Sequence, residues 1–151
     1  MRAWISPGRT SKETDESAVT PGNAFEMLRI ANTSLGMHQT WLDALAHNIS
    51  NVNTVTSTDE DAFQAQMVMA QSREDGGVDV SDIALSDPEG RLVHSPDHPL
   101  ADANGYVRYP DIDLGDQMTQ LIMAQRGYQA NLAVVERATT AYQAALQLGK
   151  G

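Results

Sequence analysis

The sequence predicts a mainly α-helical protein in which long helices near the two ends of the chain pair as a coiled coil, with a small β insertion between them. Residues 114–148 contain no proline and are rich in Ala, Leu, Gln, Met and Arg, which are strong helix formers. Residues 24–52 carry apolar residues at heptad spacing, as paired helices do. Residues 57–113 hold short apolar runs separated by Gly and Pro, which is typical of short strands and turns.

The composition limits the function classes. At 151 residues the chain makes one domain or one elongated unit. It has no cysteine, which excludes disulfides and thiolate metal sites. No apolar run approaches the roughly 20 residues of a membrane-spanning helix, and the first residues lack the apolar core of a cleaved signal peptide. The net charge of −10 argues against a general nucleic-acid binder.

The negative charge is concentrated in the middle of the chain. Residues 57–113 hold thirteen acids and three arginines, a sum of −10. Residues 1–24 sum to zero, residues 25–56 to −1 and residues 114–151 to +1. Nearly neutral ends can pack against other copies at little electrostatic cost, whereas an acidic middle repels itself. We therefore expect the middle region to face solvent.

Residues 1–23 are predicted to be a disordered N-terminal extension. Proline and glycine punctuate this stretch, and its polar centre shows no periodicity. Trp4 and Ile5 are its only large apolar residues before Val19. An alternative interpretation is therefore a short arm that docks on a neighbouring subunit through Trp4.

Residues 24–56 are predicted to form the N-terminal axial helix and an asparagine-rich turn. The apolar seam of this helix comprises Leu28, Ala31, Leu35, His38, Leu42, Leu45, Ile49 and Val52. Gly36 lowers the helix propensity, so we expect the helix to be stabilised by packing. Asn48, Asn51 and Asn53 have two interpretations: a polar turn that ends the helix, or buried amides that bond to neighbouring chains and fix the register.

The middle region, residues 57–113, is predicted to be small, acidic and rich in β-structure. Alternating apolar residues favour a strand within residues 62–71, and shorter extended runs follow near residues 78–83, 91–94 and 105–109. The core of such a β unit would be thin, consisting of Val78, Val80, Ile83, Leu92, Val93, Val107 and Met67.

Residues 114–151 are predicted to form the C-terminal axial helix. The larger side chains of this helix recur at steps of four and three: Leu114, Met118, Leu121, Gln125, Tyr128, Leu132, Val135, Thr139, Tyr142 and Leu146. A helix of this length spans about 50 Å, so its seam must be covered by another helix or by other copies of the chain. The sequence leaves open whether pairing occurs within or between subunits. Asp111 and Asp113 precede the helix, and we expect them to cap it.

One cluster resembles a catalytic site. His94, Asp97, His98 and Asp102 lie within nine residues, and these side chains are ligands for divalent metals. Pro96 and Pro99 interrupt the segment, and the spacing matches no helical metal motif. A surface loop is the favoured interpretation, and a metal-dependent hydrolase is the alternative. The sequence shows no catalytic triad spacing, phosphate loop or dinucleotide fingerprint, so we expect neither an enzyme nor a cofactor.

Several motifs resemble those of known proteins. The segment NISNVNT at residues 48–54 resembles the asparagine signature that ends the first helix of flagellar axial proteins. GVDV at 77–80, HPLAD at 98–102, GYVRYPDID at 105–113 and RGYQAN at 126–131 resemble motifs of the flagellar basal-body rod protein FlgC family, in the same order. The resemblance covers most of the chain after residue 24.

The chain also departs from the family pattern. Asp111 stands where the family usually has Asn, and Gly127 where it usually has Ala. The basic stretch that usually follows the asparagine signature is replaced by STDEDAFQAQ. Residues 1–21 have no counterpart, and two explanations compete: an extension specific to this lineage, or translation that starts at Val19.

The resemblance implies a structural subunit of the proximal rod of the bacterial flagellum. Such a subunit is exported by the flagellar type III apparatus and assembles helically with other rod proteins and with copies of itself. The residues expected to pack in the assembly are Leu28, Leu35, Leu42, Leu45, Asn48, Ile49, Asn51, Asn53, Leu121, Arg126, Tyr128, Asn131, Leu132, Val135 and Tyr142. The alternatives are another flagellar axial protein of the rod or hook, and a free coiled-coil adaptor. A rod subunit predicts a partly unfolded monomer in solution, whereas an adaptor predicts a stable helical oligomer.

Overall fold

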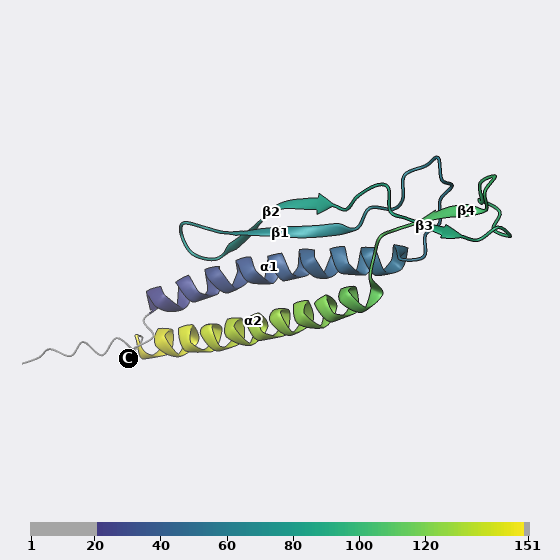
Figure 1. Cartoon of the computed structure of the whole chain (residues 1–151). Helices are drawn as coiled ribbons and strands as arrows, with labels where there is room; N and C mark the ends of the chain where they lie inside the picture. The colour runs from purple at the N-terminus through teal and green to yellow at the C-terminus, as the bar shows by residue number, and fades with distance from the viewer. Residues whose placement is uncertain (1–20, 150–151) are drawn as a thin grey trace, which may run out of the picture.

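Two long antiparallel helices run side by side along most of the molecule (Figure 1). The structure is a computed structural model that describes residues 21–149. The helices are α1 (Pro21–Asn51) and α2 (Leu114–Leu148), and the chain between them forms four short strands. The predicted fold class, two paired helices with a small β insertion, is confirmed. The predicted disorder of the N-terminal extension falls mostly on residues 1–20, which lie outside the described residues.

Helix α1 begins at Pro21, three residues before the expected start. Proline suits the first helical position because its missing N–H would have no partner there and its φ is already helical. The expectation that residues 21–23 lack regular structure is therefore wrong. The helix ends at Asn51, inside the asparagine-rich segment, and Thr54 N–H donates to the Asn51 carbonyl oxygen at 3.0 Å in the turn that follows.

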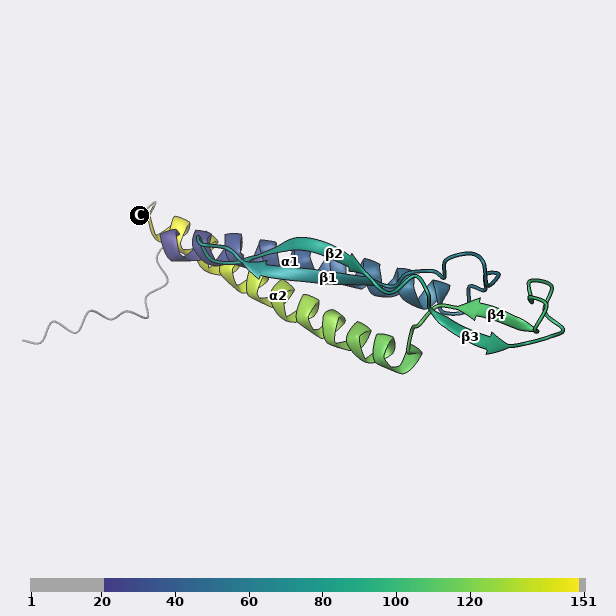
Figure 2. The same cartoon turned by 45° about the horizontal axis from the view of Figure 1, so that its top comes forward.

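Strands β1 (Gln66–Ser72) and β2 (Val78–Leu85) form an antiparallel hairpin with a bulge after Met69. The hairpin runs along the length of α1 (Figure 2), on the side away from α2 (Figure 1). A two-stranded ribbon is marginal by itself, and packing on α1 covers part of it. At its tip Arg29 binds the Asp75 carboxylate at 2.8 Å, and the Thr33 hydroxyl accepts from Val78 N–H at 3.1 Å.

Strands β3 (Arg91–His94) and β4 (Tyr106–Tyr109) pair in a second sheet. This sheet lies beyond the end of α1 (Figure 1). Val107 is fully buried, and Thr56 and Arg108 exchange backbone hydrogen bonds at 2.9 and 3.0 Å. The expected single β unit is therefore wrong: β1–β2 and β3–β4 are separate sheets. Sequence periodicity identifies strands, but it does not say which strands share a sheet.

Helix α2 begins at Leu114, where the sequence predicts, and ends at Leu148. The Asp113 carboxylate accepts from Asp116 N–H at 3.0 Å, so the predicted cap is confirmed. At the other end Gly149 N–H donates to the carbonyl oxygen of Ala145. Neither described helix carries an apolar stretch of the kind that a membrane span requires.

The buried apolar side chains are mostly small. They are Ala24, Ala31, Ala44, Leu45, Ala62, Ala65, Val107, Ile112, Ala124 and Ala138. Many larger apolar side chains remain at the surface, among them Met67, Met69, Met118 and Leu132. Small side chains let backbones approach closely, but they remove little apolar area from water. The isolated subunit therefore leaves much of its apolar surface uncovered.

Candidate assembly surface

The row of α2 side chains that meets α1 differs from the predicted seam. Ala124 and Ala138 are its buried members, and Gly127 and Gln117 contact residues of α1. Leu114, Met118, Leu132 and Leu146, all on the predicted seam, are exposed. The predicted seam consists of the larger side chains of α2. The two helices instead approach each other along the adjacent row of small residues, because small side chains allow closer packing. The larger side chains flank this contact and remain available to other molecules.

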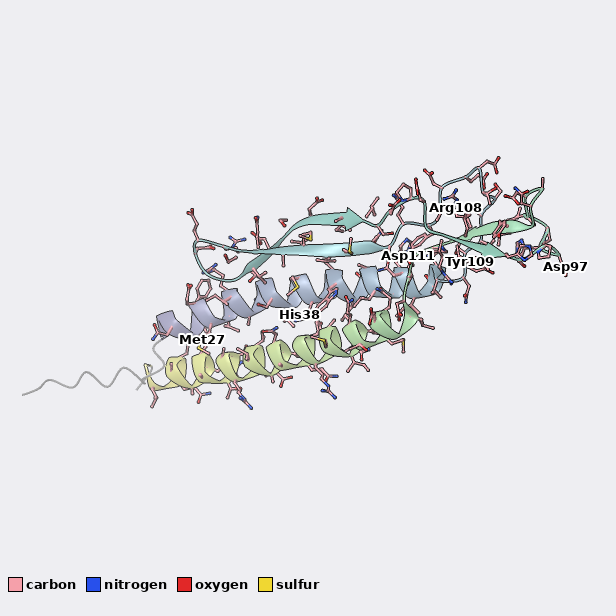
Figure 3. The ribbon with its side chains drawn as sticks, viewed as in Figure 1. Met27, His38, Asp97, Arg108, Tyr109 and Asp111 are labelled. Atoms are coloured by element: carbon pink, nitrogen blue, oxygen red, sulfur yellow. The ribbon has the colours of Figure 1, made fainter. Side chains whose placement is uncertain are left out.

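His38 fills the space that Gly127 leaves open. A Cβ built on Gly127 would lie 2.6 Å from Cδ2 of His38 and closer still to Nε2. The Nδ1 atom of His38 lies 2.8 Å from the Ser34 carbonyl oxygen one turn earlier. Because a carbonyl oxygen only accepts, Nδ1 carries the proton in this bond. The ring is thus held between the helices, as Figure 3 shows.

Asn48 is the buried polar side chain of the described core, with 2% of its surface exposed. Its amide nitrogen donates to the Gln66 carbonyl oxygen and to Oε1 of Gln117, both at 2.9 Å. Its amide oxygen accepts from Gln66 N–H at 2.8 Å. One side chain therefore joins the end of α1 to the start of β1 and to the first turn of α2. These bonds fix the register of three segments within one subunit.

The other two asparagines of the signature lie in or beside the turn. Asn51 donates to the His47 carbonyl oxygen at 2.9 Å, and its amide oxygen accepts from the Thr54 hydroxyl at 3.1 Å. Asn53 is exposed. Asn51 therefore makes local hydrogen bonds at the end of α1, unlike Asn48.

The remaining residues expected to pack in the assembly are divided by exposure. Leu45 is buried. Most of the others are half-buried: Leu28, Leu35, Leu42, Ile49, Leu121, Tyr128, Asn131, Val135 and Tyr142. Arg126 and Leu132 are exposed on α2. Asn131 donates to the Gly127 carbonyl oxygen at 3.0 Å, so this motif residue bonds within its own helix.

Large apolar side chains are exposed along α2. Leu132 is 41% exposed, Met118 45%, Ile122 48% and Met123 58%. The hairpin covers α1 on the side away from α2, so it does not cover these side chains (Figure 1). Large apolar side chains exposed on a helix are candidates for an interaction site. The arrangement suits lateral packing against other helices.

The His and Asp cluster has structural partners. The Asp102 carboxylate accepts from the backbone N–H groups of Tyr106 and Asn104 and from the Thr58 hydroxyl. These bonds, led by the one from Tyr106, lower the pKa of Asp102. The His94 ring packs edge-on against Tyr106. Asp97 lies at the tip of the β3–β4 loop, away from the helices (Figure 3). In the described part of the chain no three His, Asp or Glu side chains are placed to hold a metal ion.

The hairpin tip carries a network of charges. Arg73 binds Asp75 at 2.8 Å and Asp79 at 3.0 Å, and Arg29 binds both Asp75 and Glu26. The hydrogen bond from Arg73 is the main cause of a lowered pKa for Asp75. Gly77, with φ +94°, lies against the Thr33 hydroxyl, where no other residue fits. This network and this glycine fasten the tip to α1.

Comparisons with known proteins show that this chain is similar to proteins of the flagellar basal-body rod. Residues 103–148 match the family model described as flagellar basal body rod FlgEFG protein C-terminal. The flagellar basal-body rod protein FlgC of Salmonella typhimurium is 34% identical over 126 residues, which cover 80% of this chain and 94% of the relative. The chain belongs to the flagellar basal-body rod protein FlgC family. The relative of Yersinia enterocolitica is 36% identical over the same shares, and that of Bacillus subtilis is 26% identical over 84% of this chain.

Membership of the FlgC family makes the protein a structural component of the flagellar basal-body rod and not an enzyme. The geometry gives the family motifs physical roles. The motif at 77–80 places Gly77 on Thr33, and the motif at 105–113 ends in the cap of α2. Gly127, one of the departures from the family pattern, lies against His38.

Sequence reasoning missed a cleft between α1, β1 and the start of α2. It measures about 520 Å³, and its lining includes Trp41, Met67, Asp111, Asp116, Gln117 and Gln120. Trp41 lies off the predicted seam of α1, and it was not singled out. The available signal was its spacing: Trp41 lies three residues after His38 and four before Leu45, so it flanks the apolar seam, and such a large side chain needs a covering surface.

Proposed function

We propose that the protein is a subunit of the proximal rod, which assembles helically with copies of itself and with other rod proteins and transmits torque through packed side chains. The observation that carries the proposal is the exposed apolar surface of α2, centred on Met118, Ile122 and Leu132. A shaft transmits torque through many contacts of this kind, with no bond chemistry. The names of the relatives support the rod as the site of assembly.

Export fits the same proposal. The flagellar type III apparatus would deliver the chain nearly unfolded, and the thin core of small residues keeps the isolated subunit easy to unfold. The residues predicted for subunit packing divide accordingly. Leu45 and Asn48 are buried within the subunit, whereas Leu132 and Arg126 are exposed and would contact neighbouring subunits in this proposal.

The experiment replaces the chromosomal gene and measures both motility and incorporation. A strain that lacks the protein should be non-motile, and wild-type protein should restore swimming and appear in isolated basal bodies. Leu132→Asp should leave the helix content unchanged, but it should abolish incorporation. Thr140→Asp, an exposed change elsewhere on α2, is the matched control and should swim. A motile deletion strain, or basal bodies without the protein, would refute the proposal. A discrete helical oligomer in solution, without any basal-body protein, would favour the adaptor.

A further inference from the structure

Two arginines of α2 stand apart from the other arginines of the described chain. Arg29 and Arg73 form ion pairs, Arg91 stacks on Tyr109, and Arg108 donates to the carbonyl oxygens of Thr58 and Glu89. Arg126 and Arg137 are exposed, and within residues 21–149 neither makes an ion pair or a side-chain hydrogen bond. Among the described residues of this acidic chain, these are the arginines that remain free to meet another molecule.

The surroundings of the two free arginines differ. Ile122 and Met123, 48% and 58% exposed, lie one turn before Arg126. The corresponding residues before Arg137 are Ala133 and Val134, which are half-buried. An arginine with an exposed apolar rim is typical of an interface hot spot. Arg126 is therefore the better anchor.

The cleft beside Trp41 has the chemistry to receive a guanidinium group. Asp111 and Asp116 are both exposed carboxylates on its lining, and no ion pair in the described chain involves either. Arg91 and Asp111 also line a neighbouring cleft, but Arg91 donates to the Pro110 carbonyl oxygen. A tryptophan and two carboxylates on one lining match the chemistry of a guanidinium, which stacks on aromatic rings and donates five hydrogen bonds.

A subunit cannot fill this cleft with its own Arg126. Asp116 and Arg126 are ten residues apart on one continuous helix, which separates them by roughly 15 Å along the axis. At 3.6 residues per turn, ten residues also rotate the two side chains about 80° apart around the axis of α2. The arginine must therefore come from another molecule.

We infer that the cleft formed by Trp41, Asp111 and Asp116 receives Arg126 of a second copy of the chain. The inference rests on the proposed rod assembly and names one of its contacts. Charge complementarity selects the occupant, because this chain itself supplies both the free arginine and the unpaired carboxylates. In the helical rod proposed above the contact is heterologous, so each bound pair leaves one arginine and one cleft unoccupied and the contact propagates. A reciprocal pairing about a two-fold axis would instead fill both sites and stop at the dimer.

The test uses the absence of cysteine from the sequence. In isolated basal bodies, Arg126→Cys combined with Asp116→Cys should react with a short bifunctional maleimide to give a ladder of dimers, trimers and longer products. Either single variant should give no ladder. Arg137→Cys with Asp116→Cys is the matched control, and it should give none. Protein present in basal bodies without a ladder from the first pair would overturn the inference while leaving the proposed function intact. Absence of the wild-type protein from basal bodies would overturn both.

Charge reversal gives a second readout that does not depend on cross-linking. Arg126→Glu alone and Asp116→Arg alone should each reduce swimming at least tenfold, because each places like charges in the contact. The double variant R126E/D116R should recover most of the wild-type rate. Equal loss in the double variant and the single variants, with circular dichroism showing folded protein in all three, would contradict a direct contact.

Discussion

The imidazole of His38 lies directly over Gly127, and its Nδ1 atom is held at 2.8 Å from the Ser34 carbonyl oxygen. The pair joins the middle of α1 to the middle of α2. The ring occupies the volume that a methyl group at residue 127 would need. Because the ring is held at one nitrogen, it cannot turn aside without losing that hydrogen bond.

Gly127→Ala should therefore destabilise the protein by about 1–3 kcal/mol, the usual cost of overpacking, even though alanine is the better helix former. In a His38→Ala background the same change should stabilise by about 0.5–1 kcal/mol, because only the helix propensity remains. Urea unfolding of the wild type, Gly127→Ala, His38→Ala and the double variant measures whether the effect of the alanine at residue 127 changes sign.

Gly36→Ala is the matched control for that experiment. No atom lies within 4 Å of a Cβ built on Gly36, so this change should stabilise α1 by about 0.5–1 kcal/mol. If Gly127→Ala stabilises the protein as Gly36→Ala does, the contact between His38 and residue 127 does not constrain the helices.

Asn48→Ala should cost roughly 2–5 kcal/mol, because both backbone groups of Gln66 lose a partner in a buried setting. Asn53→Ala, at an exposed position of the same signature, should change stability by less than about 0.5 kcal/mol. Thermal unfolding of the two variants makes the comparison. Equal effects would show that the signature acts only as a turn.

Asp113→Ala should reduce the stability of α2 by about 1 kcal/mol through loss of the N-cap. Asp113→Asn should retain most of that stability, since the amide oxygen can still accept from Asp116 N–H. Far-UV circular dichroism during unfolding reports the difference. A loss as large in the asparagine variant would assign the effect to charge at the helix terminus and not to the hydrogen bond.

Acid should loosen the loop around Asp102. The backbone N–H of Tyr106 is the main cause of its lowered pKa, so the carboxylate is stabilised more in the folded state than in the unfolded one. Its contribution is fully present above the ordinary pKa of about 3.9 and is lost as the pH falls through the lower folded value. Carboxyl NMR titration of Asp102, folded and in urea, should show the lower midpoint in the folded protein.

Local signals explain how much of the fold the sequence predicts. Pro110, the capping Asp113 and Gly149 bracket α2, so its bounds follow from the chain itself. The start of α1 was missed because the proline that begins it was interpreted as a break. The placement of β1–β2 along α1 depends on Arg29, Asp75 and Thr33, contacts between distant residues that no local pattern reveals.

For the residues expected to pack in the assembly, the sequence likewise does not reveal contacts with distant residues. Asn48 was a candidate by its place in the signature, but its partner Gln117 is 69 residues away. The α2 seam was read from large side chains, while Ala124 and Ala138 make the buried row. Alanine is common in any helix, so its spacing carries little signal until the partner helix is known.

The position of α1 between the hairpin and α2 also determines when, during synthesis of the chain, α1 can be covered. This helix leaves the ribosome first, yet both surfaces that cover it are encoded later, the second of them at the very end of the chain. At ordinary synthesis rates the stretch from Asn51 to Leu148 takes roughly 5–20 s to appear. Throughout that interval the chain has no finished core, so any factor that binds unfolded chains has time to engage it before it folds.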